Sequence, residues 1–213
     1  VHVGMRDGDH AIQMINGISQ YLPLFLALSS SSPFFRGRNT HLASCRSTFF
    51  ESLPTGGHGC QFSDWADFNR GFAGLNKSGA ALTTRDLWWD VRPSPDLGTI
   101  EIRICDAPAT LSEATAIAAL IHLVCQRLDQ DIKLGKRIVV PPQWLLRENK
   151  WRAARDGIYA EFVLNESGQT APARRHLLKI IDDCSDLVNA NGYEPQMSLL
   201  KIISLLGSSS CRQ

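Results

Sequence analysis

The chain has 213 residues, 44% of them hydrophobic and 20% charged, a composition typical of globular proteins rather than of disordered or fibrous ones. Its 22 Lys and Arg residues are nearly balanced by 21 Asp and Glu residues, and the net charge of +1 provides no strong field for nucleic acid or an acidic membrane surface. Because the longest apolar run, residues 22–28, is also too short to span a bilayer, we expect neither nucleic acid nor a membrane as a partner.

The first half of the chain is predicted to run from a strand through a helix into loops. Residues 1–4 alternate as a strand does, and residues 9–28 carry apolar residues at helical spacing, with Pro23 expected to bend or split the helix. Residues 29–46, rich in Ser and Arg, are predicted to be a loop. A further loop and a short helix rich in aromatic residues are expected over residues 56–72.

Residues 85–105 predict two strands joined by a turn. The turn is marked by the prolines and the glycine of "RPSPDLG" at 92–98. Trp88 and Trp89 are neighbours on a strand, where successive side chains point to opposite faces. We therefore expect one of the two rings in the core and the other at the surface or in a pocket.

The second of these strands, in "GTIEIRICDA" at 98–107, separates an apolar face from a charged one. Ile100, Ile102 and Ile104 share one parity, so they should enter a core together. Glu101 and Arg103 then lie side by side on the opposite face.

Residues 106–135 give the clearest helical pattern in the chain. Thr110 and Glu113 form the T-x-x-E pattern of a capping box, in which each side chain satisfies a backbone N–H at the start of a helix. Gly135 is the expected stop signal.

The C-terminal part predicts two more helices, at about 172–189 and 195–206, and a frayed tail, "GSSSCRQ", at 207–213. Strands and helices do not alternate one by one, so a doubly wound α/β fold fits poorly. We predict an α+β fold, a single domain over residues 1–213, in which helices pack on one side of an antiparallel sheet.

Six cysteines lie far apart, and no two of them form a C-x-x-C pair. In a chain of this length the pattern favours reduced, mostly buried thiols and a cytoplasmic location over a disulfide framework. A zinc site built from them would require the fold to bring distant cysteines together by coincidence.

The polar residues of the predicted strands allow two interpretations each. Glu101 and Arg103 could form an ordinary ion pair on a solvated strand face, or Glu101 could bind a hard cation while Arg103 binds a carboxylate. His2 could be a partly buried strand histidine or part of the same site. Arg92 could anchor its turn or bind a phosphate.

Several segments of the chain occur together in an order found in one protein family. These segments are "VHVGM", "LPLFLALSSSSPFFRG", "THLASCRSTFF", "LPTGG", "WWDVRPSPDLGTIEIRICDAPAT" and "ENKWRAARDG". Together they closely resemble the carboxylate–amine ligases of the type-2 glutamate–cysteine ligase family. The resemblance extends from residue 1 to about residue 160 and more loosely through the last helices.

The resemblance implies a glutamine-synthetase-like antiparallel catalytic sheet that binds ATP and Mg²⁺. It implies an ATP-dependent ligase that joins an amino-acid-like carboxylate to an amine through an acyl phosphate. A homo-oligomer is compatible with this interpretation, and the sequence does not decide the number of subunits. The alternative is a truncated, non-catalytic fragment that binds a nucleotide or a partner.

The resemblance also assigns roles to the polar strand residues. His2 and Glu101 fall on the positions of metal ligands. Arg92 falls on that of a phosphate-binding catalytic arginine, which would contact the nucleotide. Arg103 falls on that of the catalytic arginine beside the acid substrate.

Two further arginines are candidate site residues, and the chain departs from the family pattern at several positions. Arg46 is a candidate for nucleotide phosphate contacts and Arg155 for substrate contacts. The family pattern usually begins H-V-H-V-G and is preceded by a segment whose acidic strand adds metal ligands, so residues 1–213 are expected to be the C-terminal portion of the ligase domain. His41 stands where the family usually has Gly, and Ser30 where it has Asn.

Overall fold

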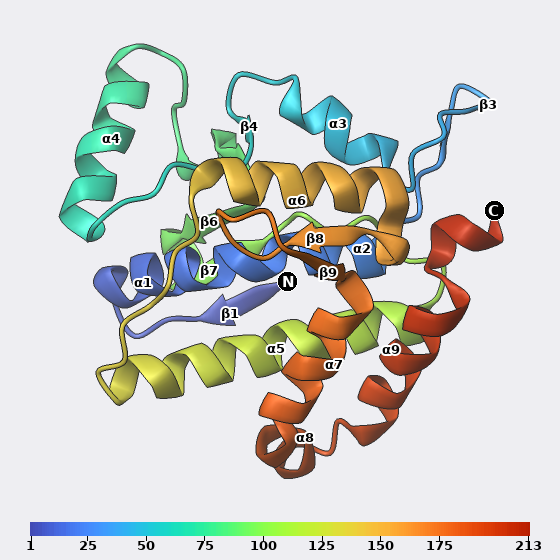
Figure 1. Ribbon diagram of the computed structural model, residues 1–213. Helices are drawn as coiled ribbons and strands as arrows, with labels where there is room; N and C mark the ends of the chain where they lie inside the picture. Colours follow the sequence, from blue (N-terminus) through green and yellow to red (C-terminus); the bar gives the residue numbers. More distant parts are fainter.

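A three-stranded antiparallel sheet in the order β1-β7-β6 lies at the centre of the computed structural model, which describes all 213 residues (Figure 1). Its strands are β1 (His2–Gly4), β6 (Val91–Ser94) and β7 (Thr99–Ile102). The turn between β6 and β7 ends at Gly98, whose φ of 62° is left-handed and suits glycine. The predicted strands are confirmed, but the turn is shorter than predicted, because residues 92–94 belong to β6 and only 95–98 form the turn.

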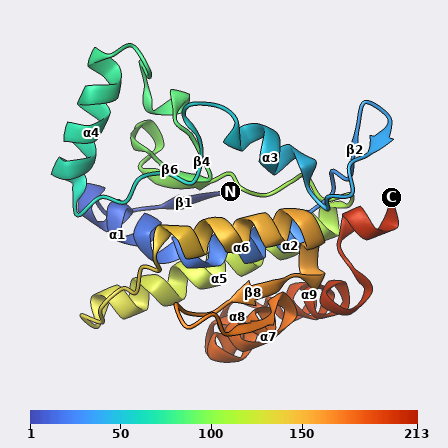
Figure 2. The same cartoon turned by 45° about the horizontal axis from the view of Figure 1, so that its top comes forward.

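Helices cover the apolar face of this sheet. Ile100, Ile102 and Ile104 are all buried, as their alternation predicts, and join one large core. In Figure 2 the sheet lies above helices α1 (Gly8–Ile18), α2 (Leu22–Ser29), α5 (Leu111–Lys133) and α6 (Gln143–Asp156). The mixed helix-and-strand class with antiparallel pairing is therefore confirmed.

Pro23 splits the first helical stretch, as predicted. The chain passes from α1 through a single 3₁₀ turn, Ser19–Tyr21, into α2. Pro23 lies in the first turn of α2, where a missing N–H breaks no helical hydrogen bond.

Two helical stretches, Gly8–Ser29 and Leu111–Lys133, have the length and hydropathy of membrane spans. However, 72% and 56% of their most apolar windows are buried inside the protein.

Helix α5 begins and ends at the predicted residues. Thr110 Oγ1 accepts the N–H of Glu113, and the Glu113 carboxylate accepts the N–H of Thr110, so the capping box is complete. Gly135, with φ of 69°, follows the last turn.

Smaller elements connect the sheet to the helical layers. The predicted loop 29–46 contains a short hairpin, β2 (Phe34–Phe35) and β3 (Arg38–Asn39), and leads into α3 (Cys45–Glu51). Strand β4 (Gly56–Gly57) pairs in parallel with β5 (Trp88–Trp89), and α4 (Trp65–Lys77) is the expected aromatic-rich helix. Trp88 is 42% exposed and Trp89 is buried, which confirms the division predicted for the two rings.

Helix α6 was not predicted, because its buried face includes two polar residues. Its buried residues recur at helical spacing, but Asn149 and Lys150 stand among them and hide the apolar period. A hairpin of β8 (Glu161–Val163) and β9 (Thr170–Pro172), also not predicted, follows it.

The C-terminal region confirms one predicted helix and corrects two other expectations. Helix α9 (Glu194–Leu206) is present, but residues 172–189 form two helices, α7 (Ala173–Asp183) and α8 (Ser185–Asn191). The tail is not frayed. Ser208 and Ser209 are buried, and the N–H of Ser210 donates to the carbonyl of Ser30 at 2.8 Å. Polar packing against a distant segment therefore orders a tail that has the composition of a loop.

All the cysteines are free thiols. Cys45, Cys125 and Cys184 are buried, Cys105 is half-buried, and Cys60 and Cys211 are exposed. Burial raises the pKa of the Cys105 thiol to about 11 and that of Cys125 to about 12.

His10 in α1 is held neutral by its surroundings. Its Nδ1 accepts the N–H of Arg6 at 3.2 Å, and its Nε2 faces Asp129 Oδ1 at 3.0 Å. Burial, and then the charge of Arg6, lower its pKa below the ordinary value. The unfolded chain therefore binds more protons, and this histidine makes the free energy of unfolding fall as the pH drops below about 6.5.

His10→Gln is expected to flatten the acid-side dependence of stability, because glutamine does not titrate. The measurement is the urea midpoint at pH 7.5 and pH 5.5. His41→Gln, at an exposed position, is the matched control and should retain the dependence of the unmodified protein. Equal pH dependence in the two variants would contradict the role given to His10.

Candidate active site

Glu101 lies at the centre of the polar face of the sheet. In the sheet, Glu101 of β7 is paired with His2 of β1 on one side and with Arg92 of β6 on the other. Because directly paired residues project to the same face, all three side chains meet there. Glu101 Oε1 lies 3.7 Å from His2 Nε2, and Oε2 lies 2.8 Å from Arg92 Nη2.

Thr99 orients the imidazole of His2. Its Oγ1 lies 2.9 Å from His2 Nδ1, which leaves Nε2 directed at Glu101. Metal-binding histidines commonly hold their second nitrogen in this way, which sets the orientation of the ring. Thr99 was not predicted, although it shares the strand parity of Glu101 and could have been found by alternation.

The His2–Glu101 pair fits a divalent cation as part of its ligand set. The imidazole nitrogen and the carboxylate are both solvent-accessible, and they approach each other closely enough to share an ion. No cluster of three or more His, Cys, Asp or Glu side chains able to hold a metal occurs in the chain. Mg²⁺ takes about six ligands, so residues 1–213 offer two of them.

Arg92 binds both the Glu101 carboxylate and backbone carbonyls of a neighbouring segment. Its Nε donates to Glu101 Oε2 at 2.9 Å, and its Nη1 donates to the carbonyls of Thr84, Arg85 and Leu87. The side chain is only 11% exposed. These contacts hold the segment 84–87 rather than the Pro-rich turn at 92–98, so the predicted anchoring of that turn is not what the structure shows, and the phosphate contact stays a prediction.

Arg103 is the more available guanidinium on the same strand face. Its Nε lies 3.5 Å from Glu101 Oε1, and its Cζ lies 5.9 Å from the centre of the exposed Trp88 ring. Burial lowers its pKa, and the positive charges of Arg92 and Arg46 lower it further. An anion bound here would relieve this crowding of like charges.

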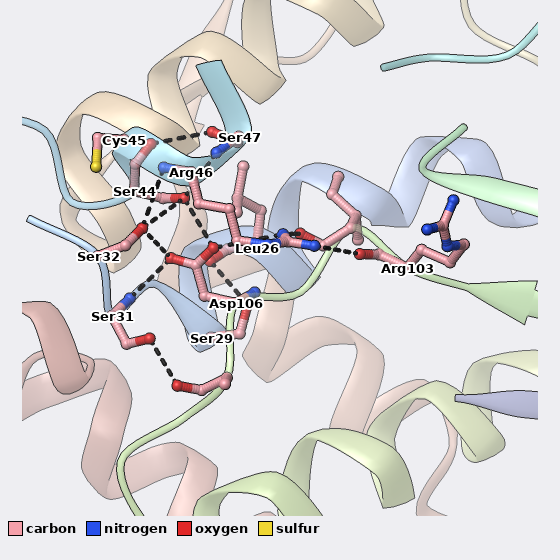
Figure 3. Close-up of polar contacts among 12 residues, drawn as sticks. Leu26, Ser29, Ser31, Ser32, Ser44, Cys45, Arg46, Ser47, Arg103 and Asp106 are labelled. Carbon is pink, nitrogen blue, oxygen red and sulfur yellow. Dashed lines mark hydrogen bonds and ion pairs between the residues drawn. The ribbon is translucent and has the colours of Figure 1, made fainter. Parts of the chain in front are cut away.

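The guanidinium of Arg46, from the first turn of α3, lies beside the backbone carbonyl of Arg103 (Figure 3). Its guanidinium donates to the carbonyls of Arg103 and Ile104 at 3.4 Å and stacks 4.5 Å from the Phe50 ring centre. Arg46, Arg103, Phe50 and Trp88 line one pocket, which we call the arginine pocket. The space they enclose is about 10 Å³, room for one water, and Asp90 also lines it. An anion such as a carboxylate or a phosphate would therefore lie at the mouth of this pocket, against the two guanidinium groups.

Arg155, the last predicted site residue, lies apart from this cluster. It is exposed near the end of α6, and its guanidinium pairs with the neighbouring Asp156 at 2.8 Å. None of its ion pairs or hydrogen bonds reaches the polar face of the sheet. The structure thus brings together all the other predicted site residues: His2, Arg46, Arg92, Glu101 and Arg103.

Sequence analysis missed a buried ion pair behind Arg103. Lys150 of α6 donates to both carboxylate oxygens of Asp90, at 2.9 and 2.6 Å, and also pairs with Glu51. The Asp90 carbonyl accepts the N–H groups of Arg103 and Ile104, at 2.7 and 3.1 Å. Helix α6 therefore holds the strand end that carries Arg103, a link between residues far apart in sequence.

In comparison with known proteins, the whole chain matches one family. The model of the family described as glutamate-cysteine ligase family 2 matches residues 1–213. The chain is 40% identical over 200 residues to the protein named "Putative glutamate--cysteine ligase 2" of Bdellovibrio bacteriovorus, covering 94% of this chain and 53% of the relative. It is 40% identical over 213 residues to "Putative glutamate--cysteine ligase 2-1" of Frankia casuarinae, covering 100% of this chain and 56% of the relative.

A third relative, from Thermobifida fusca and also named "Putative glutamate--cysteine ligase 2", is 37% identical over 213 residues. It too is covered over only 53% of its length, so the chain spans about half the length of the curated relatives it matches. The match to the family model nevertheless extends over every residue of the chain. The chain belongs to glutamate-cysteine ligase family 2.

Proposed function

We propose that this chain carries part of the active site of an ATP-dependent carboxylate–amine ligase with a glutamine-synthetase-like sheet. The observation that supports this most is the arrangement around Glu101. A carboxylate and an oriented imidazole meet beside the arginine pocket. Such a surface suits a metal–phosphate complex next to a carboxylate. The names of the relatives agree with a ligase that joins an acid to an amine.

The proposed reaction has two steps. The substrate carboxylate attacks the γ-phosphate of ATP, which gives an acyl phosphate and ADP, and an amine then displaces phosphate to form the amide. Mg²⁺, when bound, would neutralise charge on the phosphate oxygens during transfer.

The residues of the chain take separate parts in this proposal. His2 and Glu101 would hold the metal, and Thr99 keeps the imidazole directed at it. Arg103 would orient the acid through its planar fork, and Arg46 would contact a phosphate. Arg92 keeps the Glu101 carboxylate in place and is the candidate for a further phosphate contact.

The alternative function is a non-catalytic fragment that binds a nucleotide or a partner. It is favoured by the small number of metal ligands, and by β1, which pairs only with β7 and so presents a free strand edge. For the ligase, by contrast, the additional metal ligands would have to come from outside residues 1–213.

Residues 1–213 alone are therefore expected to bind Mg·ATP weakly and to release no phosphate. Calorimetry and a phosphate-release assay, with a carboxylate and an amine present, measure both. Adding the part of a relative that this chain does not match, in cis or as a separate chain, should restore both binding and turnover. Tight Mg·ATP binding with amine-dependent phosphate release by residues 1–213 would contradict the argument from missing ligands. No turnover with that part added would favour the non-catalytic alternative.

Arg103→Lys is expected to raise the KM for the carboxylate substrate about tenfold or more, with little change in nucleotide affinity. Lysine keeps the charge but loses the two-pronged geometry that a carboxylate requires. Steady-state kinetics with each substrate varied in turn measure the change, and Arg70→Lys on the exposed face of α4 is the control. Weaker nucleotide binding with an unchanged KM for the acid would mean that Arg103 faces the phosphates instead.

A further inference from the structure

Asp106 is a buried carboxylate that joins separate segments of the chain behind the arginine pocket (Figure 3). Its side chain is 1% exposed. Oδ2 accepts the N–H of Ser31 at 3.0 Å and the hydroxyl of Ser32 at 2.7 Å, and Oδ1 accepts the hydroxyl of Ser44 at 3.0 Å. The end of α2, the start of α3 and the chain beyond β7 therefore meet at one charge.

Arg46 is the cation that balances this charge. Its Nη1 lies 3.6 Å from Asp106 Oδ1, and no other Lys, Arg or His forms an ion pair with Asp106. The neutral donors alone would leave a buried negative charge, which is unfavourable. The counter-charge of Asp106 is therefore supplied by Arg46, a side chain that is 36% exposed and lines the arginine pocket.

The Arg46 guanidinium is held from three directions. Asp106 attracts it from the protein interior, the carbonyls of Arg103 and Ile104 accept its N–H groups, and the Phe50 ring lies against its face. The carbonyls and the ring stabilise its plane, but only Asp106 supplies an opposite charge. Without that charge, Arg46 would be repelled by Arg103 and free to turn towards solvent.

We propose that Asp106 is a positioning residue that keeps the Arg46 guanidinium beside Arg103, so that the two cations act on one anionic group. The inference rests on the proposed function in one respect, that Arg46 contacts the anion. It adds that the affinity of the pocket for an anion depends on a buried carboxylate that never touches the ligand.

The test is a double-mutant cycle on anion binding, with inorganic phosphate as the probe. Phosphate is titrated into protein labelled with 5-fluorotryptophan, and the ¹⁹F resonance of Trp88, identified by its loss in Trp88→Phe, reports occupancy. Arg46→Gln and Asp106→Asn are each expected to weaken phosphate binding about tenfold, the effect of losing one charged hydrogen bond. The double variant should be no weaker than either single variant, because both changes remove the same positioned guanidinium.

Asp129→Asn is the matched control. Asp129 also pairs with an arginine, Arg6, but lies on α5 and lines a different pocket. Its substitution should leave phosphate affinity unchanged. If Asp129→Asn weakens phosphate binding as much as Asp106→Asn does, the effect comes from a general change in charge or stability, and the proposal is overturned.

The outcomes separate this inference from the ligase proposal. If Arg46→Gln weakens phosphate binding and Asp106→Asn does not, or the two effects add, Asp106 does not position Arg46, although the anion contact stands. If Arg46→Gln has no effect, the positioning role is overturned as well, while the ligase proposal is still decided by Glu101.

A measurement on the unmodified protein covers the case in which Asp106→Asn does not fold. The Nε–H of a guanidinium fixed by Asp106 should show an NMR order parameter near the value of about 0.85 typical of rigid backbone. The exposed Arg70 is the internal reference for a mobile side chain. An Arg46 value below about 0.6 would overturn the proposal.

Discussion

Glu101→Gln is expected to lower ATP-dependent phosphate release at least about 100-fold, because altering even a residue that only supports a metal ligand costs 10–100-fold. The amide is nearly the same shape as the carboxylate but carries no charge for a cation. It also leaves His2 without its partner at 3.7 Å. Turnover is measured with the unmatched part of a relative added as described above, and Mn²⁺ affinity is measured by electron paramagnetic resonance.

Two controls accompany this experiment. Circular dichroism should show an unchanged fold, and Glu166→Gln, at an exposed position in the loop between β8 and β9, should retain full activity. Unchanged turnover of Glu101→Gln with the same Mg²⁺ requirement would remove Glu101 from the metal site. Loss of turnover with unchanged Mn²⁺ affinity would instead assign Glu101 to orienting Arg92 and Arg103.

Lys150→Met is expected to lower the free energy of unfolding by about 3–5 kcal/mol, the range for breaking a buried ion pair. Lys150 and Asp90 side chains are only 5% and 9% exposed, so the substitution leaves the Asp90 carboxylate buried without its cation. Because the Asp90 carbonyl binds the N–H groups of Arg103 and Ile104, we also expect weaker phosphate binding in the arginine pocket. Urea unfolding gives the stability, and the Trp88 titration gives the binding.

Lys179→Met is the matched control for Lys150→Met. Lys179 pairs with Asp183 at 2.7 Å, but these side chains are 72% and 56% exposed, so less than about 1 kcal/mol is expected. Adding Asp90→Leu to Lys150→Met should recover much of the lost stability, because an apolar pair needs no counter-charge. A loss no larger than that of Lys179→Met would show that water reaches Asp90 and that the pair is not a structural link.

Local patterns in the sequence predicted many of the elements correctly. The alternation of Ile100, Ile102 and Ile104, the capping box at Thr110 and the turn ending at Gly98 each depend on neighbouring residues, which is why they could be recognised. Helix α6 could not be recognised in this way. Its buried Lys150 is tolerated only because Asp90, sixty positions away, supplies a counter-charge.

The candidate site was predictable in part for the same reason. Alternation placed Glu101 and Arg103 on one strand face, and local sequence singled out His2 and Arg92. Family resemblance gave these residues roles and added Arg46 and Arg155. Tertiary structure was needed to show that Thr99 orients His2, that Arg92 is held by loop carbonyls and that Arg155 lies elsewhere. These contacts join segments of the chain whose spacing in sequence carries no information about their distance in space.

The sequence by itself determined the faces of β7, the ends of α5 and the family, because periodicity, capping and motif order are properties of residues close together along the chain. Only the tertiary structure decided which charges meet. Asp106 illustrates the difference: in sequence it is one acid after a strand, whereas in the fold it is a buried charge with donors from two distant segments. A buried charge is stable only with partners, and those partners are chosen by packing across the whole molecule.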